Sequence, residues 1–296
     1  MTENTILTLT AGRTEIEVWT LGARLNAATW DGEANLLDGA ATEEEARTTK
    51  LNHGSVCGPV ANRIAGGAAM IDGQTYPFER NENGKTLLHS GTKSTRDAQW
   101  SVTDQSETRA TLTLDIAHLE DDFPGNRTIT ATYSVTDQGF DLTFTATSDA
   151  TTCMNLALHP YWTLGTDRDG LRLQVNAGTY LPVDADTIPT GEQADVTGTD
   201  FDLRSLAAPS PKIDHNYCFP NDGQMRAHAT LASDRVRLDI DSTAPGLQVF
   251  TGKPFGIALE PQHWPDAPHH DTFPSILLRP GETYTQATRY RFSRPA

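Results

Sequence analysis

The residues with the clearest chemical potential lie near the end of this chain, where Glu260 closes a short apolar run. Residues 257–259 read Ile-Ala-Leu, which is typical of a buried strand. A carboxylate at such a position needs a charge partner or a chemical purpose, because burying a charge costs free energy. Pro261 favours extended backbone at Glu260 and so presents the carboxylate on stiff backbone. Two interpretations remain open: a structural ion pair, or an acid–base group in a site.

A second candidate is His159, which also precedes a proline. If residues 155–159 form a strand, alternation places Asn155, Ala157 and His159 on one face and two leucines on the other. The pattern therefore predicts that His159 points away from the apolar face and toward a cleft.

Other polar residues lie in segments that admit two readings. Arg63 follows Asn62 among glycines and apolar residues, and one reading is that its stem packs on apolar surface at a turn. The functional reading is a fixed guanidinium that binds ligand hydroxyls, with glycines allowing close approach. His89 follows two leucines and alone suggests a core or turn residue, while Asp214 alone suggests a turn.

Together these segments resemble the aldose 1-epimerases, also called galactose mutarotases. The motifs are Leu-Glu-Pro-Gln-His-Trp-Pro-Asp-Ala-Pro at 259–268, Asn-Arg-Ile at 62–64, Leu-His-Ser-Gly at 88–91, His-Pro-Tyr at 159–161 and Asp-His-Asn-Tyr at 214–217. The resemblance runs from about Gly12 to Phe292. Ser90, Leu158, Pro160 and the short segment Lys253–Phe255 depart from the family pattern, which leaves fine substrate preference open.

The resemblance implies mutarotation, the exchange of the two anomers of a cyclic aldose through ring opening. One base and one acid suffice for this reaction, and no cofactor or metal is needed. Glu260 is then expected as an ionised base and His159 as a protonated acid. The resemblance assigns sugar binding to Asn62, Arg63, His89, Tyr161, Asp214 and Gln248. Trp162 or Trp264 is expected to stack on the sugar.

A metal site carries little weight, although His263, Asp266, His269 and His270 lie close in sequence. Their spacing matches no standard zinc pattern, and neighbouring prolines restrict their convergence. The sequence also contains no glycine-rich phosphate loop of the P-loop or dinucleotide type.

Most of the chain is predicted to form strands, and we expect an all-β fold. Segments with alternating apolar and polar residues are 6–10, 14–20, 24–30, 110–117, 127–135, 139–147, 171–175, 235–240 and 283–292. Residues 40–50 form a charged, helix-like stretch, and residues 184–200 read as a long surface loop. The expectation is one domain over residues 1–296, a large antiparallel β-sandwich, which the resemblance refines to the galactose mutarotase type.

Composition limits the partners. The net charge of −16 argues against nucleic acids and anionic membranes. No stretch approaches the roughly 20 apolar residues of a membrane span, and the first seven residues show no signal-peptide pattern. Three widely spaced cysteines suggest free thiols in a reducing cytoplasm.

The expected partner is a monosaccharide, either an aldohexose or an aldopentose, and the expected protein is a monomer or a homodimer. Three alternatives stay open at this point. They are a hexose-6-phosphate epimerase, a carbohydrate-binding protein without catalysis, and a glycoside hydrolase that uses Glu260 and Asp214 as its two carboxylates.

Overall fold

The computed structural model describes residues 4–295. The first three residues of the segment used for the signal-peptide expectation lie outside this range. The strands are β1 (Ile6–Ala11), β2 (Thr14–Trp19), β3 (Arg24–Trp30), β4 (Val56–Cys57), β5 (Arg63–Ile64), β6 (Ala68–Ile71), β7 (Gln74–Pro77), β8 (Leu87–Leu88), β9 (Ser101–Gln105), β10 (Arg109–Ile116), β11 (Arg127–Thr136), β12 (Gly139–Ser148), β13 (Thr152–Cys153), β14 (Ala157–Leu158), β15 (Tyr161–Trp162), β16 (Arg172–Val175), β17 (Thr179–Tyr180), β18 (Ala194–Asp195), β19 (Asp214–Cys218), β20 (Arg226–Ala232), β21 (Arg237–Ser242), β22 (Gly246–Lys253), β23 (Gly256–Gln262), β24 (Leu277–Leu278) and β25 (Tyr284–Ser293). The helices are α1 (Glu43–Arg47) and four single 3₁₀ turns, η1 (Ala65–Gly67), η2 (Gly91–Lys93), η3 (Arg168–Gly170) and η4 (Ala267–His269).

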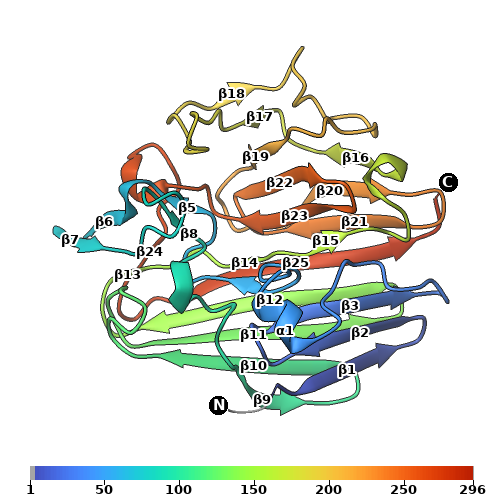
Figure 1. Cartoon of the computed structure of the whole chain (residues 1–296), viewed down its shortest axis with the longest axis horizontal. Helices are drawn as coiled ribbons and strands as arrows, with labels where there is room; N and C mark the ends of the chain where they lie inside the picture. Colours follow the sequence, from blue (N-terminus) through green and yellow to red (C-terminus); the bar gives the residue numbers. More distant parts are fainter. Residues whose placement is uncertain (1–3, 296) are drawn as a thin grey trace.

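The largest element is an eight-stranded antiparallel sheet with the strand order β16-β20-β21-β25-β12-β11-β10-β9 (Figure 1). Strand β11 shows why these segments become strands. Its residues Ile129, Ala131 and Tyr133 are buried, and the threonines between them are more exposed. A period of two with one apolar face requires this half-buried arrangement.

Two further sheets complete the sandwich. A three-stranded sheet has the order β1-β2-β3, and a six-stranded sheet has the order β15-β23-β22-β19-β17-β18. One continuous apolar core joins all three, because it contains Leu9 and Ile16 together with Ile129, Leu247 and Leu259. The expected all-β sandwich of antiparallel sheets is confirmed.

One face of the six-stranded sheet packs on the apolar core. Its other face lies toward a group of loops and short strands between residues 53 and 95. Strand β5 pairs with β8, and β14 pairs with β4, so these loops are tied to one another and to the segment before His159. A smaller apolar cluster that includes Val60, Leu87 and Trp264 packs beneath them. The candidate site lies between this group of loops and the sheet.

Two local expectations are confirmed with shorter elements. The stretch 40–50 contains α1, which has only five residues and an N-cap at Thr42. The stretch 184–200 is irregular apart from the two-residue strand β18. Among residues 4–295, no helix is long and apolar enough to cross a membrane.

Candidate active site

The floor of the site is one face of the six-stranded sheet. Neighbouring strands place Glu260 of β23 opposite Gln248 of β22, and Asp214 of β19 opposite Phe250 of β22. Because side chains alternate along a strand, residues 248 and 250 share one face, and Leu247 and Val249 enter the core on the other. The sheet thus places a carboxylate, an amide and an aromatic ring on one surface.

Glu260 and His159 face each other in this site. His159 Nε2 lies 3.4 Å from Glu260 Oε1, and both side chains are almost fully buried. Backbone hydrogen bonds from His159 N to Ser55 O and from Gly54 N to His159 O fix the histidine against the loop before β4. The two residues that precede prolines therefore form one pair, as a two-group acid–base site requires.

The charge state of this pair differs from the expectation. Burial lowers the pKa of His159 to about 3. Burial also raises the pKa of Glu260 well above its usual value, with a further contribution from Asp214. The expected protonated histidine beside an ionised glutamate is wrong for the free protein, because removal from water disfavours both charged forms. Burial therefore favours a neutral imidazole on His159 and opposes ionisation of the Glu260 carboxyl group.

His89 is a neutral hydrogen-bond donor at the wall of the site. Its Nδ1 accepts a hydrogen bond from the backbone N–H of Asn62 at 3.0 Å, and His89 N donates to Asn62 O at 2.8 Å. Nδ1 therefore carries no proton, and Nε2 carries it. Burial lowers the pKa of His89 well below its ordinary value. Both Asn62 and His89 have left-handed backbone, with φ of 60° and 49°.

Arg63 is held by two carboxylates. Its Nε and Nη2 each donate to Glu82 at 2.8 Å, and its Nη1 lies 4.0 Å from Asp214 Oδ2. Asp214 Oδ1 also accepts a hydrogen bond from Gln248 Nε2 at 2.6 Å. The guanidinium is thus fixed in the site with its Nη1 edge facing Asp214, and the turn interpretation of Arg63 is wrong.

Aromatic contacts come from residues other than the expected tryptophans. Trp162 is fully buried and packs against Tyr290 and Phe292 in the core. Trp264 donates from Nε1 to Pro245 O within the smaller apolar cluster. Neither indole lines the pocket that contains Glu260, so the stacking prediction is wrong. Tyr161 and Phe250 line this pocket instead.

Comparisons with known proteins agree with this geometry. The family model described as aldose 1-epimerase matches residues 5–291. The chain belongs to the aldose 1-epimerase family. It is 33% identical to human galactose mutarotase over 273 residues, which cover 81% of this chain and 78% of that protein. It is 30% identical to the Escherichia coli K12 aldose 1-epimerase over 275 residues, which cover 81% of this chain and 79% of that protein.

Solved structures of the family share the fold. An aldose epimerase homologue from C. elegans superposes with a TM-score of 0.91 at 25% identity, covering 99% of this chain and all of that one. A galactose 1-epimerase from Lactobacillus acidophilus gives a TM-score of 0.86 at 23% identity, with both chains covered completely. The sandwich described above is therefore the galactose mutarotase fold.

In this aldose 1-epimerase family member, all eight residues predicted for the site line one pocket of about 120 Å³. The pocket is formed by Asn62, Arg63, Leu88, His89, His159, Tyr161, Asp214, Gln248, Phe250 and Glu260. Sequence reasoning missed Leu88 and Phe250. Phe250 could have been found from strand alternation, since it lies two residues after Gln248. Glu82, the partner of Arg63, was also missed.

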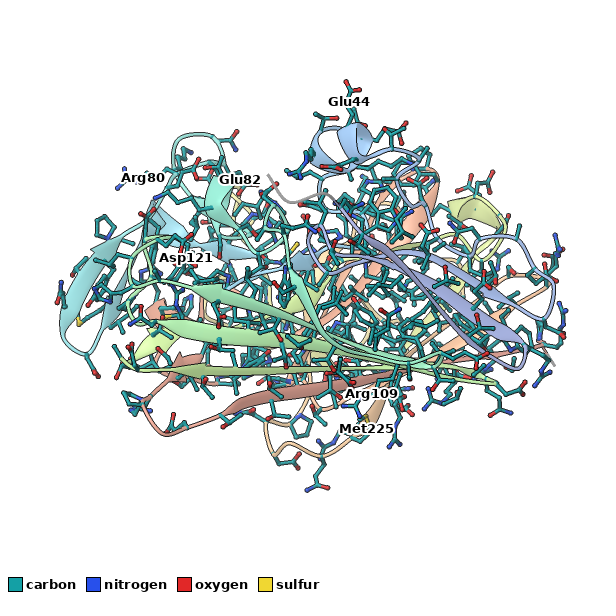
Figure 2. All side chains as sticks on the ribbon, turned by 90° about the horizontal axis from the view of Figure 1, so that it is seen from below. Glu44, Arg80, Glu82, Arg109, Asp121 and Met225 are labelled. Atoms are coloured by element: carbon teal, nitrogen blue, oxygen red, sulfur yellow. The ribbon has the colours of Figure 1, made fainter. Side chains whose placement is uncertain are left out.

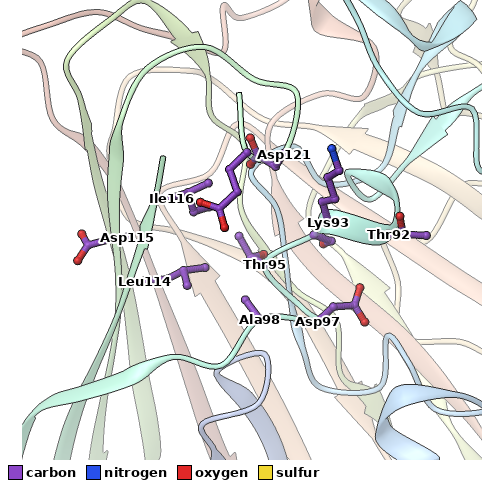
Figure 3. Close-up of a pocket in the computed structure, with 11 residues that line it drawn as sticks. Thr92, Lys93, Thr95, Asp97, Ala98, Leu114, Asp115, Ile116 and Asp121 are labelled. Carbon is purple, nitrogen blue, oxygen red and sulfur yellow. The ribbon is translucent and has the colours of Figure 1, made fainter. Parts of the chain in front are cut away.

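Two other features of this family member do not compete with that pocket. A larger cavity of about 380 Å³ lies between residues 92–98 and 114–121, and its lining includes Lys93 and Asp115 but none of the predicted residues (Figure 3). In the histidine-rich loop, Asp266 accepts from His269 Nδ1 at 2.6 Å and from Ala65 N at 2.9 Å. Within residues 4–295, no group of three His, Cys, Asp or Glu residues could hold a metal.

Proposed function

We propose that this pocket interconverts the α and β anomers of a free aldose, with Glu260 and His159 as the proton-transfer pair. Members of the aldose 1-epimerase family are isomerases, and mutarotation is the activity that family membership gives to this chain. The observation that carries the residue assignment is the buried pair itself. Its two titratable groups lie 3.4 Å apart in a pocket whose other lining residues are mostly hydrogen-bonding side chains.

The reaction moves two protons. The anomeric hydroxyl loses its proton to one group of the pair, and the ring oxygen receives a proton from the other as the C1–O5 bond breaks. C1 then rotates, and ring closure on the other face reverses both transfers. In our proposal, Glu260 takes the proton from the anomeric hydroxyl and His159 gives its proton to the ring oxygen.

The burial of the pair determines which of its two charge states is favoured before ring opening and which after it. An ionised glutamate beside a histidinium and a protonated glutamate beside a neutral histidine hold the same number of protons. Ring opening by the proposed route converts the first form into the second. Burial favours the second form, so a proton must first move from Glu260 to His159, and ring opening then returns the pair to its favoured form.

Unsatisfied polar atoms support a ligand rich in hydroxyl groups. Within residues 4–295, the buried atoms Gln248 Oε1, Glu260 Oε2 and His159 Nδ1 have no hydrogen-bond partner in the protein. Buried polar groups nearly always have a partner, so these atoms are candidates for contact with a bound molecule. The neutral Nε2–H of His89 and the Nη1 group of Arg63 add donors, and Tyr161 and Phe250 add apolar surface for the sugar ring.

Other parts of the proposal concern the setting of the enzyme. We propose a cytoplasmic enzyme that takes a free aldohexose or aldopentose, and the three free, buried cysteines are compatible with a reducing compartment. The shared core of the sheets supports one domain over the chain. We retain a monomer or homodimer as the expected state in solution.

Polarimetry on freshly dissolved α-anomers of several aldoses tests this function directly. The enzyme should accelerate the approach to the equilibrium rotation beyond the spontaneous rate, for at least one neutral aldose. Sugar binding without acceleration would indicate a binding protein instead. Release of nitrophenol from a nitrophenyl glycoside would indicate a glycoside hydrolase.

A further inference from the structure

Glu82 lies outside the described pocket lining, yet it makes the strongest contacts of the site arginine. Two parallel hydrogen bonds of 2.8 Å join its carboxylate to Arg63 Nε and Nη2. Such a bidentate pair fixes the plane of the guanidinium as well as its distance. The side chains of Arg63 and Glu82 are only 11% and 21% exposed, so water screens this pair weakly. Nη1, the remaining edge, lies toward Asp214.

The loop that carries Glu82 is built to hold it in place. Glu82 and Thr86 form an antiparallel bridge across a three-residue loop, residues 83–85, in which Lys85 N donates to Glu82 O and closes a β-turn centred on Asn83 and Gly84. Both turn residues have positive φ, 53° and 68°, the geometry for which the Asn-Gly sequence is strongly preferred. Asn81 adds two side-chain hydrogen bonds to the backbone of Leu88, the β8 residue that pairs with Arg63. Figure 2 shows Glu82 on the same loop as Arg80.

The charges around the pocket disfavour the binding of anions. Arg63 is the one permanent cation among the described residues that line it. Glu82 and Asp214 both place a carboxylate beside Arg63. His89 and His159 add no positive charge, since burial keeps both neutral.

We propose that Glu82 is a specificity-determining and positioning residue: it orients Arg63 and neutralises its charge, so that Arg63 binds neutral sugar hydroxyls and does not attract anionic sugars. The proposal rests on the function proposed above. An arginine with a free fork binds carboxylates and phosphates bidentately. Glu82 already occupies that fork. An anionic sugar would meet an Arg63–Glu82 pair with no net charge and a second carboxylate, Asp214, beside it.

The test compares two substrates that differ in charge at one carbon, D-galactose and D-galacturonate. The measured quantity is the ratio of kcat/KM for galacturonate to kcat/KM for galactose, from polarimetry corrected for spontaneous exchange. Glu82→Gln should raise this ratio at least about tenfold, because it removes one unit of negative charge next to a weakly screened group. The change for galactose itself should appear in KM more than in kcat, since within residues 4–295 the Glu82 carboxylate hydrogen-bonds Arg63 and no residue of the proton-transfer pair.

Three variants make the result specific to Glu82. Glu82→Asp retains the charge and should keep the ratio near the wild-type value. Glu82→Ser is a second neutral variant and should raise the ratio as Glu82→Gln does. Asp186→Asn is the matched control: this carboxylate pairs with Lys85 on the same loop at 2.9 Å but does not touch Arg63. Its ratio should remain within about twofold of the wild type, because a solvent-exposed pair is screened.

Several outcomes would overturn the proposal. One is a ratio unchanged in both neutral variants. Another is an equal rise of the ratio in Asp186→Asn, which would indicate that any negative charge near the pocket opening disfavours galacturonate. A third is a fall in kcat for galactose without any change in the ratio, which would place Glu82 in the chemistry of the reaction. Acceleration of galactose exchange by the wild type is a separate readout. It tests the proposed function alone, so the two failures can be distinguished.

Discussion

At the scale of single residues, the site depends on two titratable side chains kept away from water. Glu260 and His159 are each more than 90% buried, and burial shifts their pKa values in opposite directions. A protein that maximised stability would replace such a pair with apolar residues. Retaining it fits a site in which some stability is given up for chemistry.

The raised pKa of Glu260 predicts how Glu260→Gln changes stability. Between the unfolded value of about 4.5 and the higher folded value, the folded protein binds one more proton than the unfolded chain. Wild-type stability therefore falls as pH rises through this window, by up to about 1.4 kcal/mol per pH unit. Glutamine does not titrate, so the variant should gain stability relative to wild type as pH increases.

Denaturant unfolding of both proteins from about pH 4.5 to 8 checks this expectation. Glu260→Asp is a useful control, because it retains a titrating carboxyl group. Constant relative stability across the range would contradict the raised pKa. A variant much less stable than wild type at every pH would favour the structural ion pair that the sequence left open.

At the scale of elements, strand β22 separates two tasks on its two faces. Leu247 is fully buried in the core, whereas Phe250 lines the pocket. Leu247→Ala should therefore destabilise the protein by about 2–5 kcal/mol and leave kcat/KM per folded molecule nearly unchanged. Phe250→Ala should raise KM for the sugar with a smaller loss of stability, because the partly exposed ring contributes less buried area.

Thermal unfolding together with mutarotation kinetics measures both effects. The expected result is a crossed pattern, with the stability effect in one variant and the KM effect in the other. The same pattern in both variants would mean that the two faces of β22 are not independent.

Local sequence patterns predicted the strands and part of the site, but not the contacts that depend on how distant elements pack. Alternation correctly predicted β11, and its apolar residues face the core. Glu260 and His159 were found because each precedes a proline and lies in a recognisable motif. Glu82 could not be found in this way, since its contact with Arg63 depends on a tight turn and on the pairing of β5 with β8. The sequence also did not reveal that Trp162 is buried or that burial shifts the pKa values of Glu260 and His159, because a local pattern does not give depth below the surface.

At the scale of the whole molecule, three antiparallel sheets share one apolar core, and the site lies on a face of the six-stranded sheet outside that core. A fold in which the sheets supply both core and site floor can hold side chains accurately without a cofactor to organise them. Family membership and this architecture together lead us to expect that acid–base chemistry is the whole mechanism.

Exhaustive chelation tests that expectation. Activity of the purified enzyme should survive dialysis against EDTA, since proton transfer between two side chains and the sugar needs no metal. The same dialysis without EDTA is the control. Loss of activity that added zinc restores would revive the histidine-rich loop, including His269 and Asp266, as a metal site.

The central claim is that Glu260 and His159 move the protons of ring opening, and the rate of mutarotation by Glu260→Gln tests it most directly. The substitution preserves size and hydrogen bonding but removes proton transfer. Polarimetry should show kcat reduced by at least about 10²-fold, with sugar binding retained through Arg63, Asp214 and Gln248. Adding His159→Asn should cost much less than the product of the two single losses, because both residues serve one transfer. Near-normal mutarotation by folded Glu260→Gln would contradict the account.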